Sequence, residues 1–161
     1  MQDTVYTPSA AQSAQVEILK QINAACAEKQ IHYWIAGGYA NDILVNQLTR
    51  DHHDVDMIVL DTDKPEFVEV LKVLGFEFMD SGEGLDETFK FVNPSNNFRV
   101  EFGTIVEENG KLKLGEYEMP KAYFPEQALG QLNGTALRCV SFEGLQRLDM
   151  IQDQQFGYAS V

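Results

Sequence analysis

The chain has 161 residues, of which 44% are hydrophobic, so it is the size of one domain with a single sizeable core. Its 25 acidic and 12 basic residues give a formal net charge of −13. A field of that sign repels nucleic acid and attracts cations, which argues against a nucleic-acid partner, although the acidity also has a simpler explanation in solubility. No apolar run approaches the roughly 18 residues that span a bilayer and no secretory signal opens the chain, so we expect a cytoplasmic protein with no membrane partner.

The chain begins with a segment that shows no periodic pattern. We expect residues 1–10 to form a loose arm and residues 11–161 to form one domain. Between Ala11 and Lys29 the apolar residues recur on one side of a helix, which should cover a sheet. Cys26 and Cys139 are too few and too isolated for a disulfide framework, so each is expected to pack as a small apolar group.

A strand-to-helix turn is predicted at Gly37 and Gly38. The preceding run, Tyr33–Ala36, has the aromatic and β-branched content of a buried strand. After the glycines, apolar residues recur at helical spacing at Ala40, Ile43, Leu44 and Leu48. Glycine tolerates unusual backbone angles and lets amide groups approach a phosphate at the positive end of a helix. The pattern indicates a phosphate-binding turn, with an ordinary turn as the alternative.

Asp54 and Asp56 open the next apolar run, which continues to Leu60. Residues two apart on a strand face the same side, so both carboxylates should project together. Carboxylates are hard oxygen ligands of the kind that Mg²⁺ takes from proteins. The alternative is that both are solvated residues at the start of a strand.

The next elements are expected to form the scaffold. Asp63 should cap a helix that ends at Gly75, with strands over 76–79 and 87–92 on either side of a turn at 80–86. Another strand is expected over Arg99–Ile105. The glycines of the turn lack the third glycine of a dinucleotide-binding fingerprint, and no glycine pair precedes Lys-Ser/Thr at P-loop spacing, so both of these common nucleotide folds are excluded.

The last part of the chain alternates turns and short elements. Asn109 and Gly110 predict a type I′ hairpin turn. Residues 115–133 are expected to be irregular and to border an acceptor pocket. A short strand over Thr135–Val140 should follow, and Ser141 should cap the last helix.

The runs from Trp34 to Asp42 and from Thr49 to Asp56 together resemble a known signature. They are similar to the DNA polymerase beta-like nucleotidyltransferase superfamily, and most of all to the aminoglycoside and lincosamide nucleotidyltransferases. The matching positions are Trp34, Gly37, Gly38, Asp42, Arg50, His52, Asp54 and Asp56. The resemblance implies an α+β fold with a mixed sheet of about five strands and helices packed on it.

The resemblance also implies a reaction, in which a nucleoside monophosphate passes from an NTP to a hydroxyl group and pyrophosphate leaves. Asp54 and Asp56 would hold Mg²⁺, and Glu101 would either be a further metal ligand or accept the proton of the hydroxyl. An exposed strand acid without a role is the alternative for Glu101. The implied nucleotide-binding residues are Gly37, Gly38, Arg50 and His52, of which the last two fit a structural role equally well.

The chain departs from the family pattern at Ala36, Gly103 and Asp149, but it keeps Asp54 and Asp56. The chemistry is therefore better supported than any particular acceptor. We expect an NTP and a small acceptor such as an aminoglycoside or a lincosamide. The negative net charge of the chain favours a cationic acceptor. The oligomeric state is left open, a homodimer included. Two alternative functions remain: a toxin-type nucleotidyltransferase that modifies tRNA or protein, and a nucleotide-binding module without turnover.

Overall fold

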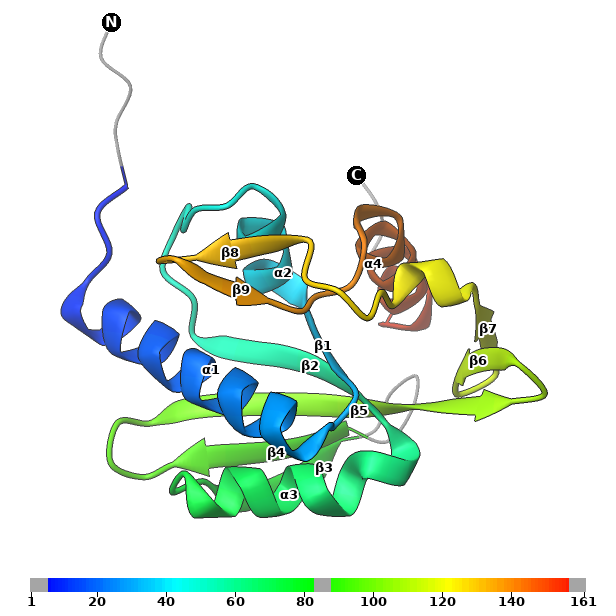
Figure 1. The fold of residues 1–161 in the computed structure, drawn as a ribbon, viewed down its shortest axis with the longest axis horizontal. Helices are drawn as coiled ribbons and strands as arrows, with labels where there is room; N and C mark the ends of the chain where they lie inside the picture. The colour runs from blue at the N-terminus through cyan, green and yellow to red at the C-terminus, as the bar shows by residue number, and fades with distance from the viewer. Residues whose placement is uncertain (1–5, 83–87, 157–161) are drawn as a thin grey trace, which may run out of the picture.

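The computed structural model describes residues 6–82 and 88–156. Its centre is a mixed seven-stranded sheet with the order β1-β2-β5-β4-β3, which β6 and β7 extend from β5 (Figure 1). The strands of the sheet are β1 (Tyr33–Ala36), β2 (Asp54–Leu60), β3 (Glu77–Gly82), β4 (Thr88–Asn93), β5 (Phe98–Glu108), β6 (Lys111–Leu114) and β7 (Tyr117–Met119). A separate hairpin is formed by β8 (Gly130–Leu132) and β9 (Thr135–Leu137). The predicted α+β class with a mixed sheet is confirmed, with β6 and β7 added to the expected five strands.

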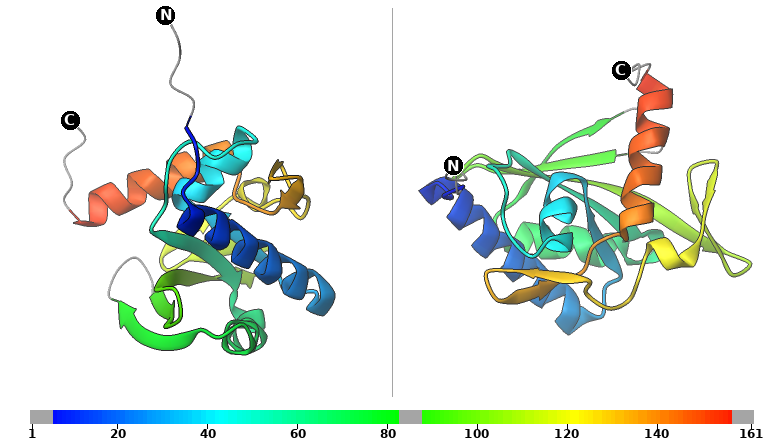
Figure 2. Two further views of the ribbon diagram at one scale, coloured as in Figure 1. Left: turned by 90° about the vertical axis from the view of Figure 1, so that its left-hand side faces the viewer. Right: turned by 90° about the horizontal axis from the view of Figure 1, so that it is seen from above.

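Helices cover the sheet from both sides. They are α1 (Ala10–Lys29), α2 (Gly37–Leu44), α3 (Lys64–Val73) and α4 (Phe142–Phe156). The helix α1 contacts α3, α2 contacts α4, and the two pairs lie on opposite sides of the sheet (Figure 2). Phe67 of α3 packs edge-on against Phe102 of β5, with ring centroids 4.9 Å apart. Because neighbouring side chains on a strand face opposite sides, Glu101 points away from α3, toward the side of α2 and α4. No helix in the described part of the chain is long and apolar enough to cross a membrane.

The first helix begins slightly before the predicted boundary. Ser9 is its N-cap, and the backbone N–H of Gln12 donates a hydrogen bond of 3.0 Å to the Ser9 Oγ. Ahead of the helix, the Tyr6 hydroxyl donates a hydrogen bond to the Asp51 carboxylate. The buried residues of the helix are Gln12, Val16, Leu19, Ile22 and Cys26. Both Cys26 and Cys139 are free and buried, as predicted.

Three local predictions are confirmed. Gly75 follows α3 with a φ of 96°, a left-handed conformation that suits glycine at the end of a helix. Asn109 and Gly110 have φ values of 52° and 79°, the two positive angles of a type I′ turn. The backbone N–H of Gly144 donates to the Ser141 Oγ at 3.0 Å, so Ser141 does cap α4.

Other predicted boundaries were wrong because contacts distant in sequence extend or end an element. The strand β3 continues through Gly82 by pairing with β4, so the predicted turn begins too early at Asp80. The rest of that turn and Glu87, the predicted start of the next strand, fall in residues 83–87, outside the described part. The helix α2 ends at Leu44, and Leu48 lies beyond it.

The prediction for residues 115–133 was also wrong. This range contains β7, a 3-10 turn at Lys121–Tyr123, and β8. By contrast, the strand expected to reach Val140 ends at Leu137, and beyond it only Cys139 forms an isolated bridge, to Ile35. These short strands exist through pairing with partners and carry no strong pattern of their own.

Asp63 precedes α3 but does not cap it with its side chain. Its carboxylate instead accepts a hydrogen bond of 2.8 Å from the backbone N–H of His32 and lies 2.9 Å from the His32 Nδ1. The predicted side-chain cap at Asp63 is therefore not formed.

Candidate active site

Parallel pairing of β2 and β5 brings the predicted acidic residues together. Asp56 lies directly opposite Glu101 in the register, and Asp54 lies opposite Arg99. Directly paired residues on neighbouring strands point to the same face of a sheet, and Asp54 and Asp56 are two residues apart. All three predicted carboxylates therefore share the face of the sheet that α2 and α4 border.

Gly37 lets the Asp56 carboxylate approach the beginning of α2. The φ of Gly37 is 63°, in the left-handed region that favours glycine. A Cβ atom on Gly37 would lie 2.4 Å from the Asp56 Oδ2, closer than real Cβ contacts come. The predicted phosphate-binding turn and one predicted metal ligand are thus in direct contact, and glycine is required at this position for two independent reasons.

The Asp56 carboxyl group holds its proton more tightly than an ordinary aspartate does. The pKa of Asp56 is raised from 3.8 to about 6, first by burial and then by the charges of Glu101, Asp54 and Asp149 in that order of importance. The Asp56 side chain keeps access to solvent, and the neighbouring protein atoms displace part of its hydration. Asp149 comes from α4 and was singled out in the sequence only as a departure from the family pattern, so its nearness to Asp56 is a feature that sequence reasoning missed.

The chemistry of these residues fits a divalent cation. A cation held by Asp54 and Asp56 would relieve the charge repulsion that, after burial, raises the Asp56 pKa, and carboxylate oxygens are the ligands that Mg²⁺ prefers. Within residues 6–82 and 88–156, no group of three or more His, Cys, Asp or Glu side chains is arranged to hold a metal ion. Mg²⁺ commonly takes only one or two protein carboxylates and completes its shell with phosphate oxygens and water, so the two aspartates meet its usual demand.

Gly38 brings two further predicted residues next to the turn. A Cβ atom on Gly38 would lie 2.6 Å from the Arg50 Nη2 and 2.7 Å from the His52 Nδ1. Arg50 is exposed, and its Nη1 donates to the Asp51 carbonyl oxygen at 3.1 Å. Its guanidinium group therefore lies beside the first turn of α2, where backbone amides are free to bind an anion.

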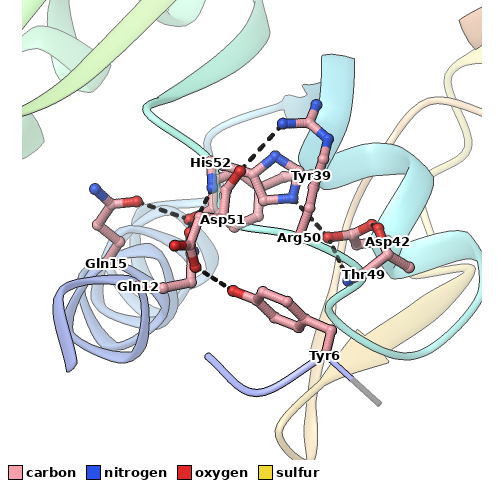
Figure 3. A network of polar contacts seen from close by, with 9 residues as sticks. All are labelled: Tyr6, Gln12, Gln15, Tyr39, Asp42, Thr49, Arg50, Asp51 and His52. Carbon is pink, nitrogen blue, oxygen red and sulfur yellow. Dashed lines mark hydrogen bonds and ion pairs between the residues drawn. The ribbon is translucent and has the colours of Figure 1, made fainter. Parts of the chain in front are cut away.

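His52 is buried behind the turn. Only 5% of its surface is exposed, and its Nε2 lies 2.6 Å from the Asp42 Oδ2. The ring also lies against Tyr39, with ring centroids 4.2 Å apart. Sequence reasoning placed Asp42 and His52 in the same motif but gave Asp42 no role, and the spacing alone could not show that the two side chains meet (Figure 3).

Part of residues 115–133, the predicted border of an acceptor pocket, lines a hollow. A hollow of about 440 Å³ is lined by Leu60, Leu112, Phe124 and Pro125 among others. Leu60 ends β2, whereas Asp54 and Asp56 begin it, so this hollow lies at the opposite end of the strand from the carboxylates. The segment 115–133 therefore borders a hollow, but one that does not adjoin the candidate site.

Replacing Gly37 by alanine is expected to impair both stability and turnover. The positive φ alone should cost about 1–3 kcal/mol, and the contact with Asp56 adds a steric conflict in the site. Gly110→Ala is a matched control, because Gly110 has a φ of 79° with nothing within 4 Å of its Cβ position. Urea unfolding should show a loss in both variants, whereas kcat/KM should fall only in Gly37→Ala. Equal activity in the two variants would contradict the assigned contact.

Asp56→Asn is expected to raise the Tm of the metal-free protein above about pH 6. A pKa raised to about 6 from 3.8 means that the folded protein binds the proton more tightly than the unfolded chain, so ionisation of Asp56 destabilises the fold as the pH rises. The gain should therefore vanish below about pH 4, where both states are protonated. Thermal scans with a chelator at several pH values test this, with the exposed Asp61→Asn as control. A pH-independent difference would rule out the explanation.

Several known proteins are similar to this chain in sequence or in structure. A model of the aminoglycoside-2''-adenylyltransferase family matches residues 18–159. A 2''-aminoglycoside nucleotidyltransferase of Escherichia coli is 29% identical over 133 residues, which are 83% of this chain and 71% of that protein. One of Klebsiella pneumoniae is also 29% identical over 133 residues, with the same coverage of the two chains.

Two solved structures share the fold. The crystal structure of ANT(2'')-Ia in complex with adenylyl-2''-tobramycin superposes with a TM-score of 0.76 at 23% identity, over 88% of this chain and 77% of that one. The lincomycin-bound lincosamide adenylyltransferase LnuA superposes with a TM-score of 0.63 at 14% identity, over 86% of this chain and 84% of that one. Because the family model spans most of the sequence, the chain belongs to the aminoglycoside-2''-adenylyltransferase family, and it is a nucleotidyltransferase.

Proposed function

We propose that this enzyme transfers AMP from ATP to a hydroxyl group of an aminoglycoside, the 2''-hydroxyl in the first instance. The observation that carries the proposal is the position of Asp56, which touches Gly37 of the phosphate-binding turn on one side and pairs with Glu101 on the other. This arrangement puts phosphate binding, metal binding and proton acceptance within one site. The family supplies the nucleotide and the class of acceptor.

Different residues of the site bind the metal and the phosphates. Asp54 and Asp56 hold the divalent metal, for which we propose Mg²⁺, and the metal when bound neutralises charge on the phosphates and polarises the phosphoryl oxygens. The first amides of α2, at Gly37 and Gly38, bind phosphate oxygens, and Arg50 beside them adds positive charge.

Glu101 acts on the acceptor. Its carboxylate accepts the hydroxyl proton while the hydroxyl oxygen forms a bond to the α-phosphorus of ATP, and the bond from that phosphorus to the pyrophosphate oxygen breaks. Glu101 lies in the middle of β5, a long strand held on both sides by β2 and β4, so its backbone is fixed by the sheet. A rigid support of this kind suits a group that has to meet a reacting hydroxyl.

The charge of the chain favours a cationic acceptor. The formal net charge is −13, and the acidic side chains of Glu101 and Asp149 border the site. Aminoglycosides carry several ammonium groups, so this field would raise their local concentration and speed their association. A tRNA acceptor would meet the same field as repulsion.

The test is a transfer assay with purified protein and Mg²⁺. Each of the four NTPs is combined in turn with tobramycin, lincomycin, tRNA or no acceptor, and both pyrophosphate release and the mass of the acceptor are measured. We expect pyrophosphate release with ATP and tobramycin, and a tobramycin product heavier by one AMP group. Transfer to lincomycin or tRNA alone would replace the proposed acceptor, and ATP binding without any product would leave only a nucleotide-binding module.

A further inference from the structure

A buried polar network lies behind the candidate nucleotide site and joins three segments of the chain. It connects α1 through Gln12, α2 through Tyr39 and Asp42, and the loop between α2 and β2 through Thr49 and His52 (Figure 3). Gln12, Asp42 and His52 are at most 5% exposed. Burial of so many polar groups is unfavourable unless each is hydrogen-bonded, so the network holds a defined geometry.

Asp42 is the centre of this network. Its Oδ1 accepts a hydrogen bond of 2.6 Å from the Thr49 Oγ1, and its Oδ2 accepts one of 3.2 Å from the Thr49 backbone N–H. The His52 Nε2 lies 2.6 Å from the same Oδ2. An ionised carboxylate only accepts hydrogen bonds, so the Nε2 carries a proton and the Nδ1 is the ring edge turned toward Gly38. Asp42 thereby fixes both ends of the loop from Thr49 to His52.

The His52 backbone is fixed as well. Its N–H donates to the Gln12 Oε1 at 2.5 Å, and the Gln12 side-chain amide in turn donates to the Tyr39 hydroxyl. The Tyr39 ring covers the His52 ring. The imidazole is therefore held at its Nε2, at one face and through its own backbone, and it has no freedom to reach a nucleotide at the surface.

We propose that the Asp42–His52 pair is a positioning unit for the nucleotide site. Between the two anchored ends of the loop lies Arg50, whose guanidinium group is beside Gly38, and two residues after His52 the strand β2 begins at Asp54. The pair sets the position of Arg50 and of Asp54 relative to the first turn of α2. The phosphate-binding and metal-binding halves of the site are thereby held in one geometry. This inference rests on the proposed function, because it assigns a cause to the shape of the same site.

The chain offers a control of the same chemistry, in a more exposed place, for this pair. His32 and Asp63 form a second histidine–aspartate contact, at 2.9 Å, at the other end of β1 from Gly37. The variants His32→Gln and Asp63→Asn lose a contact of the same chemistry at a place that does not border the nucleotide site. They separate the loss of a polar pair in general from the loss of this pair.

The experiment measures Mg²⁺·ATP affinity by calorimetry without acceptor, together with kcat, the KM values for ATP and tobramycin, and Tm. We expect Asp42→Asn and His52→Gln each to weaken ATP binding about 10- to 100-fold, as small displacements of binding groups do, with a much smaller change in the KM for tobramycin. The double variant should be no worse than the worse single variant, because the two residues act as one unit. The two control variants should bind ATP as the wild type does.

Thr49→Val keeps the experiment decisive if a variant of the buried pair does not fold. Thr49 is exposed, and valine removes only its hydroxyl bond to Asp42. We expect a smaller loss of ATP affinity, of about threefold, at an almost unchanged Tm. Variants that lose Tm but bind ATP with wild-type affinity would overturn the positioning role. A wild type that binds no ATP would instead reject the proposed function itself.

Discussion

Asp56→Asn is expected to lower kcat/KM for transfer by at least about 10³-fold while the protein remains folded. The metal stabilises several kcal/mol of developing charge in phosphoryl transfer, and a thousandfold loss corresponds to about 4 kcal/mol at 1.4 kcal/mol per tenfold. The fold should persist because Asp56 is not part of the hydrophobic core, and its ionised form is destabilised by the neighbouring acids. Asp54→Asn should also lower kcat/KM, because it too removes a carboxylate that holds the metal.

The measurement compares steady-state rates over a range of Mg²⁺ concentrations. Asp61→Asn is the control, since Asp61 directly follows β2 and is exposed without facing the site. If Asp56 holds the metal, its variant should need far more Mg²⁺ for its residual activity, whereas Asp61→Asn should follow the wild-type curve. Near wild-type transfer by Asp56→Asn at ordinary Mg²⁺ would remove the metal assignment.

Much of the site was predictable because its signals are local in sequence. Gly37 and Gly38 follow a strand-like run and precede a helical one, so consecutive residues predict the turn from strand to helix. The alternation of Asp54 and Asp56 likewise fixes their shared face within one strand. Both predictions needed only the chemistry of neighbouring residues.

What could not be predicted depends on contacts between distant segments. Periodicity does not tell which residue of β5 pairs with Asp56. A shift of one residue in the register would have placed Val100 or Phe102, in place of Glu101, opposite Asp56. Similarly, the acidic neighbour Asp149 reaches the site through the packing of α4, the last helix. Resemblance to a family suggested Glu101, but only the register of the parallel strands places it beside Asp56.

The role of His52 could not be predicted either, because it too depends on contacts between distant segments. Sequence reasoning offered nucleotide contact and a structural role as equal alternatives for His52. Burial distinguishes them: His52 is 5% exposed and bound to Asp42, whereas Arg50 is exposed beside Gly38. Burial is a property of the whole fold, and here it favours the proposed positioning role of His52 over direct contact with the nucleotide.

Glu101→Gln is expected to lower kcat by about 10² to 10⁴-fold and to leave Mg²⁺·ATP affinity nearly unchanged. This is the range typical for the loss of a proton acceptor, and glutamine keeps the size of the side chain while it cannot take up the proton. The number of carboxylates already available favours this role over that of a third metal ligand. Two aspartates already meet the usual carboxylate demand of Mg²⁺.

The position of Glu101 in the sheet provides the control. On β4, Lys90 lies opposite Glu101, and on β2, Asp56 lies opposite it, so Glu101 is flanked by one positive and one negative side chain on the same face. Glu107 belongs to the same strand β5 but is exposed and paired with Lys121 at 2.9 Å, away from the carboxylates. Glu107→Gln should therefore keep wild-type kcat, which separates a role in the site from a general effect of removing an acid from this strand.

Calorimetric titration of Mg²⁺·ATP and the acid limb of kcat/KM against pH distinguish the two roles of Glu101. If Glu101 accepts the proton, the acid limb in Glu101→Gln should lose the contribution of Glu101 and keep that of the metal ligand Asp56, whose pKa is raised to about 6. If it is a metal ligand, nucleotide affinity should fall together with kcat, because one carboxylate of the metal site is lost. Unimpaired turnover in Glu101→Gln would exclude Glu101 from the site, and Asp149, the other acid whose charge raises the Asp56 pKa from outside β2, would then be the residue to test as the base.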